Sequence, residues 1–193
     1  MAWLVAGLGN PGDRYANTRH NVGRKVVDEM ARAAGERFRK VRFLPAELAE
    51  ISEGDERVLL VRSTLFMNES GTSYAGVAKK QGVYPEHVVA VHDEIEIAPG
   101  ELRIKLGGGT AGHNGLRSLQ SALRSPDFYR VRCGVGRPPG RRDPAEFVLA
   151  PIAKRDEADI AILVDRAVDA VRSLIADGLA STQERFNRQA PSA

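Results

Sequence analysis

Residues 3–12 read Trp-Leu-Val-Ala-Gly-Leu-Gly-Asn-Pro-Gly. The apolar run that ends at Gly7 is short and unbroken, which is typical of a strand buried on both faces. The glycines and the proline that follow end this strand and begin a polar loop that extends to about Arg19. Residues 20–34 then carry apolar side chains at helical spacing, and Gly35 suits the end of a helix. The first 35 residues therefore predict a strand, a loop and a helix.

The rest of the chain continues this alternation of strands and helices. Strands are expected at 46–51, 57–61, 87–92, 102–106 and 129–135, and helices at 68–81, 115–123 and 155–176. The pattern favours an α/β fold, a single-domain three-layer α/β/α sandwich around a twisted, mostly parallel sheet. The hairpin at 46–61 adds an antiparallel pair, so we expect a mixed sheet. The domain should span 1–188, and 189–193 should form a disordered tail because nothing there anchors it.

Composition supports a folded protein in a reducing compartment. With 193 residues, 42% of them hydrophobic and 27% charged, the chain can bury one ordinary core. Cys133 is the single cysteine, so no internal disulfide can form, and its setting in an apolar strand predicts a small buried side chain. No apolar run is long enough for a signal peptide or a membrane span. We therefore expect a cytoplasmic protein with no membrane contact.

Positive charge is concentrated in one part of the chain. Residues 101–142 hold nine basic and two acidic residues, a formal charge of +7, whereas the whole chain carries only +3. Such asymmetry is typical of a surface that binds a polyanion such as nucleic acid. The alternative is a solvated basic face in an arginine-rich chain.

The loop after the first strand contains a motif that suggests a different function. Gly-Leu-Gly-Asn-Pro-Gly at 7–12 matches the dinucleotide-binding pattern G-x-G-x-x-G. That pattern works only when a helix begins inside it and directs its amides at the pyrophosphate. Here Pro11 interrupts the motif, a polar loop follows, and Asp28, near the spacing of a ribose-binding acid, falls in the expected helix. We therefore disfavour a dinucleotide cofactor.

Polar residues follow three of the expected strands. Asn10 follows the first strand, Asn68 comes after the strand that ends near Val61, and Asp93 ends the strand at 87–92. Ligands of open α/β sheets bind beyond the carboxyl ends of the strands, so these side chains predict an active site. His20 lies near a helix start beside the glycine-rich loop, and a carboxylate such as Asp93 could hold its ring in one tautomer. The alternatives are a surface histidine and a solvated acidic loop. His92 should face away from Asp93 and serve packing.

A second glycine-rich loop lies at 107–115, with five glycines in nine residues around Thr110, His113 and Asn114. It lacks the Gly-Lys-Ser/Thr ending of a P-loop, so it is either a mobile gate or a flexible turn. The chain has no His/Cys cluster at metal-ligand spacing and no Gly-x-Ser-x-Gly motif. Activated water is therefore the expected nucleophile.

Six motifs together resemble those of bacterial peptidyl-tRNA hydrolases, in order and over nearly the whole chain. They are Gly-Leu-Gly-Asn-Pro-Gly (7–12), Thr-Arg-His-Asn (18–21), Phe-Met-Asn-Glu-Ser-Gly (66–71), His-Asp-Glu (92–94), Ala-Gly-His-Asn-Gly-Leu (111–116) and Arg-Val-Arg-Cys-Gly-Val-Gly-Arg-Pro (130–138). Ala111 stands where the family's motif has glycine, which puts the mobility of that loop in question.

The resemblance implies a monomeric enzyme, without metal or organic cofactor, that hydrolyses the ester between a peptide and the 3′ ribose of tRNA. It implies that His20 is the base and Asp93 its partner. It further implies substrate contacts by Asn10, Tyr15, Phe66, Met67, Asn68, His113 and Asn114, and a grip on the tRNA 5′ phosphate by Lys105 and Arg132. Both of these cations belong to the basic window found independently from charge.

Two other functions remain open from the residues themselves. A catalytically silent RNA-binding domain would explain the basic window, but it would leave His20 and Asp93 without a role. A dinucleotide-dependent oxidoreductase would rest on residues 7–12 alone. The sequence also leaves open whether residues 144–147 or the last helix closes over the site.

Overall fold

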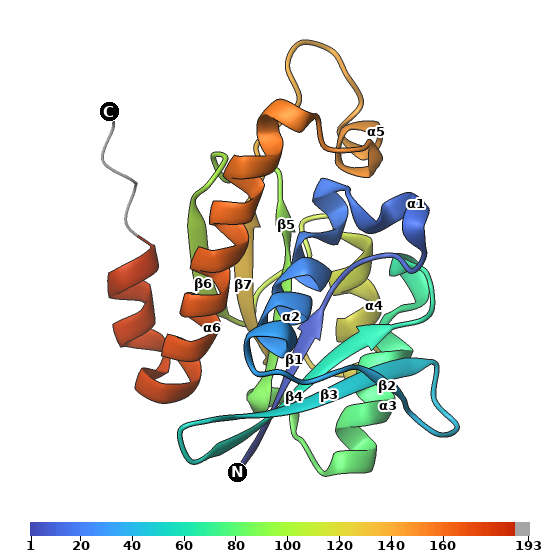
Figure 1. Cartoon of the computed structure of the whole chain (residues 1–193), viewed down its shortest axis with the longest axis vertical. Helices are drawn as coiled ribbons and strands as arrows, with labels where there is room; N and C mark the ends of the chain where they lie inside the picture. Colours follow the sequence, from blue (N-terminus) through green and yellow to red (C-terminus); the bar gives the residue numbers. More distant parts are fainter. Residues whose placement is uncertain (188–193) are drawn as a thin grey trace.

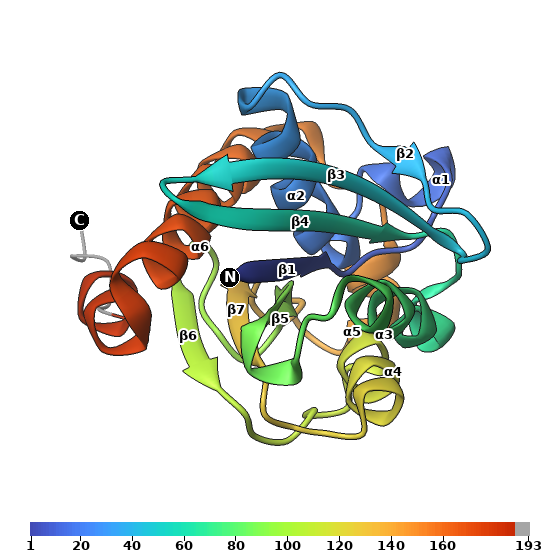
Figure 2. The same cartoon turned by 90° about the horizontal axis from the view of Figure 1, so that it is seen from below.

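A seven-stranded mixed sheet forms the centre of the computed structural model, which describes residues 1–187 (Figures 1 and 2). Its strands are β1 (Ala2–Gly7), β2 (Arg39–Lys40), β3 (Ala46–Glu53), β4 (Glu56–Ser63), β5 (Val88–Glu94), β6 (Leu102–Leu106) and β7 (Tyr129–Gly134). The spatial order is β2-β3-β4-β1-β5-β7-β6. The neighbours β4, β1, β5 and β7 are parallel, and antiparallel pairs complete both edges. The expected mixed sheet with a parallel centre is confirmed.

Helices cover both faces of this sheet. They are α1 (Asp13–Ala16), α2 (Val22–Ala33), α3 (Gly71–Gln81), α4 (Asn114–Leu123), α5 (Pro144–Leu149) and α6 (Glu157–Phe186). Side chains alternate along β1, so Val5 packs in the cluster with α2 and α6, whereas Leu4 and Ala6 pack with α3 and α4. Figure 2 shows α3 and α4 side by side and away from α6. The chain is thus a three-layer α/β/α sandwich with a buried core on each face of the sheet.

Two glycines allow helices near the site to lie directly against neighbouring backbone. A Cβ on Gly23 of α2 would overlap the carbonyl oxygen of Val91 in β5, so only glycine lets α2 lie directly against that strand. A Cβ on Gly71 of α3 would overlap the carbonyl oxygen of Ser118 in α4 in the same way. These contacts fix α2 against β5 and α3 against α4.

The structure corrects several expected boundaries. A 3₁₀ turn at Arg19–Asn21 precedes α2, so His20 lies before this α-helix and not in it. The short helices α1 and α5 were not predicted, because neither is long enough to show a periodic pattern. Helix α6 continues past residue 176 through a kink at Gly178, where φ is 80°. The tail expected at 189–193 lies outside the described residues.

Two side chains that the sequence analysis predicted to serve packing are buried. Cys133 is fully buried in β7, as its setting predicted. His92 is also fully buried, and its ring packs against that of His113 at a centroid distance of 5.0 Å. None of the helices within residues 1–187 is both long and apolar enough to cross a membrane.

Candidate active site

The carboxylate of Asp93, near the end of β5, lies between two histidine rings. His20 Nδ1 is 3.0 Å from each Asp93 oxygen, and His113 Nε2 is 2.8 Å from Oδ1. Asp93 is only 3% exposed, whereas the side chain of His20 is 13% exposed. The structure therefore brings the predicted pair His20 and Asp93 together, although they are 73 residues apart. It also adds His113 to them.

The partners of each ring nitrogen fix the positions of the ring protons. His113 caps α4, and its Nδ1 accepts from the backbone amides of Gly115 and Leu116, at 3.1 and 3.3 Å. An accepting Nδ1 carries no proton, so the proton lies on Nε2 and is donated to Asp93. His20 donates from Nδ1 to the same carboxylate, which leaves its Nε2 as a lone pair. Of these two rings, His20 is therefore the one with a nitrogen that can take a proton.

The pKa shifts of Asp93 and His20 agree with this assignment of ring protons. Burial alone would raise the pKa of Asp93, but the charges and hydrogen bonds of His20 and His113 hold that pKa well below its usual range. Burial lowers the pKa of His20, but the charge of Asp93 and its hydrogen bond outweigh this and raise that pKa above 6.5. Asp93 is thus a permanent anion, and His20 titrates above its ordinary value.

A second structural pair, Asn10 and Asn21, supports the loop beside His20. Asn21 accepts from the Asn10 amide at 2.8 Å and donates to the Asn10 carbonyl at 2.9 Å. The side-chain oxygen of Asn10 accepts from the Met67 amide at 2.7 Å, so its NH₂ group is the part still able to donate to a ligand. Sequence analysis assigned Asn21 no role of its own, because its partner is eleven residues away across the loop.

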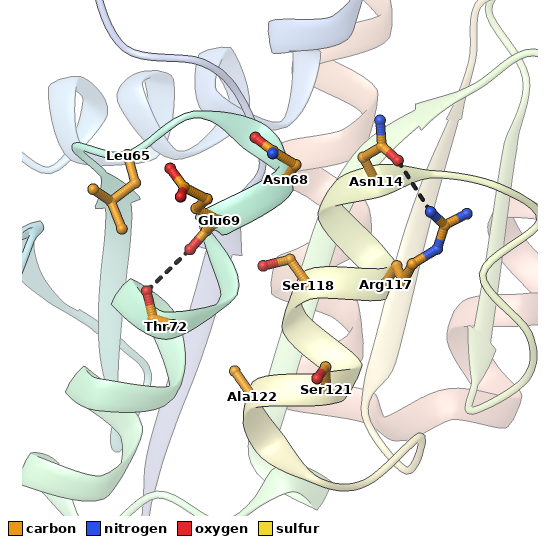
Figure 3. A pocket seen from close by; sticks show the side chains of 9 residues that line it. All are labelled: Leu65, Asn68, Glu69, Thr72, Asn114, Arg117, Ser118, Ser121 and Ala122. Carbon is orange, nitrogen blue, oxygen red and sulfur yellow. Dashed lines mark hydrogen bonds between the residues drawn. The ribbon is translucent and has the colours of Figure 1, made fainter.

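Asn68 and Asn114 lie on opposite sides of a groove between α3 and α4, at the same end of it (Figure 3). Asn68 belongs to a 3₁₀ turn, Met67–Glu69, and Asn114 is the first residue of α4. Met67 is buried beside them, and a Cβ on Gly115 would lie 2.5 Å from its sulfur. Gly115 therefore permits α4 to pack on Met67 and sets the separation of the two asparagines.

A second cavity, of about 400 Å³, is lined in part by His20. Its walls include His20, Asp93 and Asn114 on one side and Ala145, Val148 and Leu149 on the other. The last three belong to α5, which Figure 1 places with α1 at the end of the sheet away from the N-terminus. Of the two segments that the sequence left open, α5 is the one that borders this cavity.

The comparisons with known proteins agree with this geometry. A model of the peptidyl-tRNA hydrolase family matches residues 4–193. The chain belongs to the peptidyl-tRNA hydrolase family. Peptidyl-tRNA hydrolase of Cutibacterium acnes is 49% identical over 96% of this chain and 98% of its own, and that of an Arthrobacter strain is 47% identical over 96% of each. The crystal structure of peptidyl-tRNA hydrolase from Acinetobacter baumannii has a TM-score of 0.90 and 30% identity, and the match covers 99% of this chain and 97% of that one. The resemblance found from the motifs is confirmed.

The loop before α4 departs from the family's motif at Ala111, where the backbone conformation favours the glycine of that motif. Ala111 has a φ of 47°, in the left-handed region where glycine is favoured. The buried Arg130 supports the same loop by donating to the carbonyl oxygens of Gly108 and Gly109. This arginine belongs to the basic window, but the structure uses it to hold the loop.

The other two cations predicted to contact tRNA lie on neighbouring strands, Lys105 on β6 and Arg132 on β7. Burial lowers the pKa of Lys105, and the charges of Arg132 and Arg130 lower it further. The positive charges of these three side chains therefore lie near one another. Arg132 is 3.5 Å from Glu94, a residue that lines the cavity over His20. The cationic strands thus border the site of this peptidyl-tRNA hydrolase family member.

The remaining predicted residues, Tyr15 and Phe66, pack on each other. Their rings meet edge to face at 6.1 Å, and Phe66 is 54% exposed. Neither residue borders the cavity over His20 or the groove at Asn68. They form an aromatic pair beside these hollows.

Two alternative ligands can be tested against the geometry. Ligand atoms of His20, Asp93 and His113 lie within 4.8 Å of one another, but the two nitrogens already donate to the carboxylate, so a metal ion would have to displace both protons. No helix begins within residues 7–12, since α1 starts at Asp13 and has four residues. The helix start that dinucleotide binding requires is therefore missing from this loop.

Replacing His113 should separate its two roles. His113→Ala removes both the cap of α4 and one donor to Asp93, and we expect a loss of about 1–3 kcal/mol in the free energy of unfolding. His113→Asn keeps a good N-cap but loses the donor, so it should recover part of that loss. Urea unfolding measures both variants. Equal stability of the two would mean that the cap contributes nothing.

Proposed function

We propose that this chain hydrolyses the ester between a peptide and the 3′ ribose of tRNA, with His20 as the general base. Membership of the family supports the reaction. The observation that carries the choice of base is the orientation of His20, whose Nδ1 is held by Asp93 while its Nε2 is left to accept a proton. A histidine with a pKa somewhat above 6.5 is well matched to proton transfer near neutral pH.

The reaction proceeds in two steps. Water attacks the ester carbonyl carbon as its proton passes to Nε2 of His20, and the carbonyl oxygen becomes an oxyanion. The oxyanion then collapses, the bond to the ribose oxygen breaks, and the imidazolium returns its proton to that oxygen. Asp93 orients the ring and stabilises the imidazolium. Such base catalysis typically supplies about a hundred- to ten-thousand-fold in rate.

Neutral donors stabilise the oxyanion and position the substrate. Asn68, through its side chain or a nearby backbone amide, is the first candidate, and one such donor can contribute about 3 kcal/mol. Asn10 offers only its NH₂ group, because Met67 already uses its oxygen. Asn10, Asn68 and Asn114 share substrate positioning, and Met67 and His113 line the site. The aromatic pair Tyr15 and Phe66 contacts the substrate at the margin.

Amide side chains explain a preference for N-acylated substrates. An asparagine both donates and accepts, so it can bind a peptide bond on both sides. Free aminoacyl-tRNA would bring a charged amine and leave those partners unpaired, which is costly in a partly buried site.

The tRNA is held outside the reacting centre. Lys105 and Arg132 grip its 5′ phosphate, and the glycine-rich loop lies beside them. The proposal includes an enzyme that acts as a monomer in the cytoplasm, as the resemblance to the family implies. Base and amide donors suffice for the ester, so the proposal needs neither a metal nor an organic cofactor.

Removal of the base is the direct test. His20→Ala should lower kcat by about 10²- to 10⁴-fold while the Kd for tRNA changes little, because the ring acts on water and not on the tRNA body. Release of peptide from peptidyl-tRNA measures the rate. His87→Gln, at the opposite end of β5, is the matched control and should keep wild-type turnover. Normal turnover by His20→Ala would refute the assignment.

The pH dependence of kcat/KM tests the role of Asp93. Because the base acts when it is unprotonated, kcat/KM should rise with pH through the pKa of His20, with a midpoint above 6.5 in the wild type. Asp93→Asn removes the charge that raises this pKa but leaves the burial that lowers it. The midpoint should therefore move to lower pH while the plateau falls. An unchanged midpoint in Asp93→Asn would contradict the electrostatic role.

The phosphate grip should depend on salt. Lys105→Ala combined with Arg132→Ala should weaken tRNA binding and reduce the slope of log K against log salt by about 1–2, as expected when one or two phosphate contacts are lost. Arg155→Ala, which removes an exposed cation in the 3₁₀ turn before α6, is the control. Fluorescence anisotropy with tRNA at several salt concentrations gives both slopes. Identical slopes would remove these two residues from the tRNA contact.

A further inference from the structure

A second concentration of positive charge lies at the edge of the sheet opposite to the one that carries Lys105. Residues 37–42 contain four cations in six positions, and β2 runs through this segment. In the strand order β2 and β6 are the two outermost strands, and the six steps between them, at about 4.8 Å each, amount to roughly 29 Å. Figure 2 shows the two strands at opposite sides of the molecule. This charge therefore lies outside the surface proposed to hold tRNA, and the reaction gives it no role.

The alternation of side chains along β2 divides its two cations between the faces of the sheet. Arg39 pairs in register with Leu48, whose side chain packs against the core cluster that contains α3. Arg39 therefore points to the α3 side of the sheet, and Lys40 points to the other side. Both side chains are exposed.

The end of α3 adds two more cations to the Arg39 side. Lys80 donates from Nζ to the carbonyl oxygen of Arg42 at 3.2 Å, so the loop after β2 lies against the last turn of this helix. Lys79 and Lys80 are both exposed. We call the exposed side chains gathered here the edge patch; they are Arg39, Arg42, Phe43, Lys79 and Lys80.

The cations of the edge patch have no acidic partners. Within residues 1–187, none of the four lies within 4.0 Å of a carboxylate oxygen. Glu50 is on the same face of the sheet, two residues after Leu48 in β3, but it is already paired with Arg57 at 2.7 Å. The positive charge of the patch is therefore available to an anionic ligand.

Phe43 is presented to solvent in an unusual backbone conformation. Its side chain is 87% exposed, and its φ of 65° lies in the left-handed region that bulky residues rarely adopt. The guanidinium carbon of Arg42 lies over the ring, 4.5 Å from its centroid. The loop is held to α3, because the Ser73 hydroxyl donates to the carbonyl oxygen of Pro45 at 2.7 Å. A flat aromatic ring beside an arginine is thus fixed at the surface.

The chemistry of the patch favours single-stranded RNA. Cations without acidic partners bind phosphates, and an exposed aromatic ring beside an arginine stacks on an unpaired base. Protection of an outer strand from edge-to-edge pairing explains charged side chains on β2, but it explains neither the exposed Phe43 nor the two lysines of α3. A membrane surface requires several apolar side chains that insert together, and Phe43 is the single apolar member of the patch.

We propose that the edge patch binds a single-stranded segment of a second RNA, one that is not the tRNA being hydrolysed. Arg39, Lys79 and Lys80 bind its phosphates. One base stacks on Phe43 next to the Arg42 guanidinium. Because the patch and the cations of β6 lie at opposite edges of the sheet, the protein can hold this RNA and its tRNA substrate at the same time. The inference goes beyond the proposed hydrolysis and does not depend on it.

Phe43→Gly tests the stacking contact. Glycine adopts a φ of 65° without strain, so this variant should unfold at the wild-type temperature or above it. The probe is a fluorescein-labelled single-stranded RNA of about 12 nucleotides without self-complementary sequence, and its Kd should rise about tenfold. Phe43→Trp keeps a stacking ring and should bind at least as tightly as the wild type. Fluorescence anisotropy measures each Kd.

Arg39→Ala combined with Lys79→Ala tests the phosphate contacts. Loss of two contacts to a single strand should reduce the slope of log K against log salt by about 1.4. Lys40→Ala removes an exposed cation from the opposite face of β2, so it is the matched control and should keep the wild-type slope. Hydrolysis of peptidyl-tRNA should stay within about twofold of the wild type in all these variants, because the patch shares no contact with the reacting groups.

The Lys105→Ala, Arg132→Ala double variant locates the bound RNA. It should bind the single-stranded probe with the wild-type Kd. Loss of binding in that variant, or a wild-type Kd in Phe43→Gly, overturns the edge patch as an RNA site. A fall in kcat/KM on peptidyl-tRNA that parallels the loss of RNA affinity assigns the patch to the substrate tRNA and also overturns the proposal.

A sedimentation assay with phosphatidylserine vesicles distinguishes RNA from a membrane. Wild-type protein that binds these vesicles and does not bind the RNA probe makes the patch a membrane contact and refutes the inference. Binding of the probe that depends on Phe43 and on the cations of the patch supports it. If such binding is found in an enzyme that fails to hydrolyse peptidyl-tRNA, the proposed function is wrong and the edge patch stands.

Discussion

The buried carboxylate of Asp93 is the group on which the rest of the site depends. A charge with 3% exposure costs several kcal/mol unless hydrogen-bond donors replace its water. His20 and His113 supply those donors, one from the turn before α2 and the other from the cap of α4. The carboxylate therefore ties together a strand and the starts of two helices from opposite faces of the sheet. The same contacts that stabilise the buried charge direct the free nitrogen of His20 toward the cavity.

The site forms only if α2 and α4 lie close to their neighbours, and this explains the positions of Gly23 and Gly115. Any side chain at position 23 would push α2 away from Val91 and carry His20 away from Asp93. At position 115 a Cβ would meet both the Met67 sulfur and the ring of His113, so it would disturb the two asparagines and the second donor together. The backbone conformation of these two glycines is of less importance than the missing side chain. Packing and chemistry therefore constrain the same residues.

Much of this arrangement could be predicted from the sequence, and the rest depends on contacts that only the fold creates. The alternation of apolar strand runs and helical spacing along the chain was sufficient to predict the α/β architecture, since both are local patterns. The motifs predicted that His20 and Asp93 share one site, and the structure brings the two side chains together. The role of Asn21 was not predicted, because its two hydrogen bonds to the backbone of Asn10 leave no periodic pattern in the sequence. The second donor to Asp93 was missed for the same reason, and His113 appeared only as a residue that lines the site. Short α5 has too few turns to show a pattern.

Three imidazoles lie in contact in this site, and their surroundings explain why only His20 is proposed as the base. The rings of His20 and His92 each lie 5.0 Å from that of His113. Burial, and then the charge of His113, lower the pKa of His92 to about 3, so this ring stays neutral and adds no positive charge beside Asp93. His113 accepts two backbone amides on one nitrogen and donates from the other, so it has no lone pair for water. In the proposed mechanism three neighbouring histidines supply a single base, because two backbone amides occupy His113 and burial keeps His92 neutral.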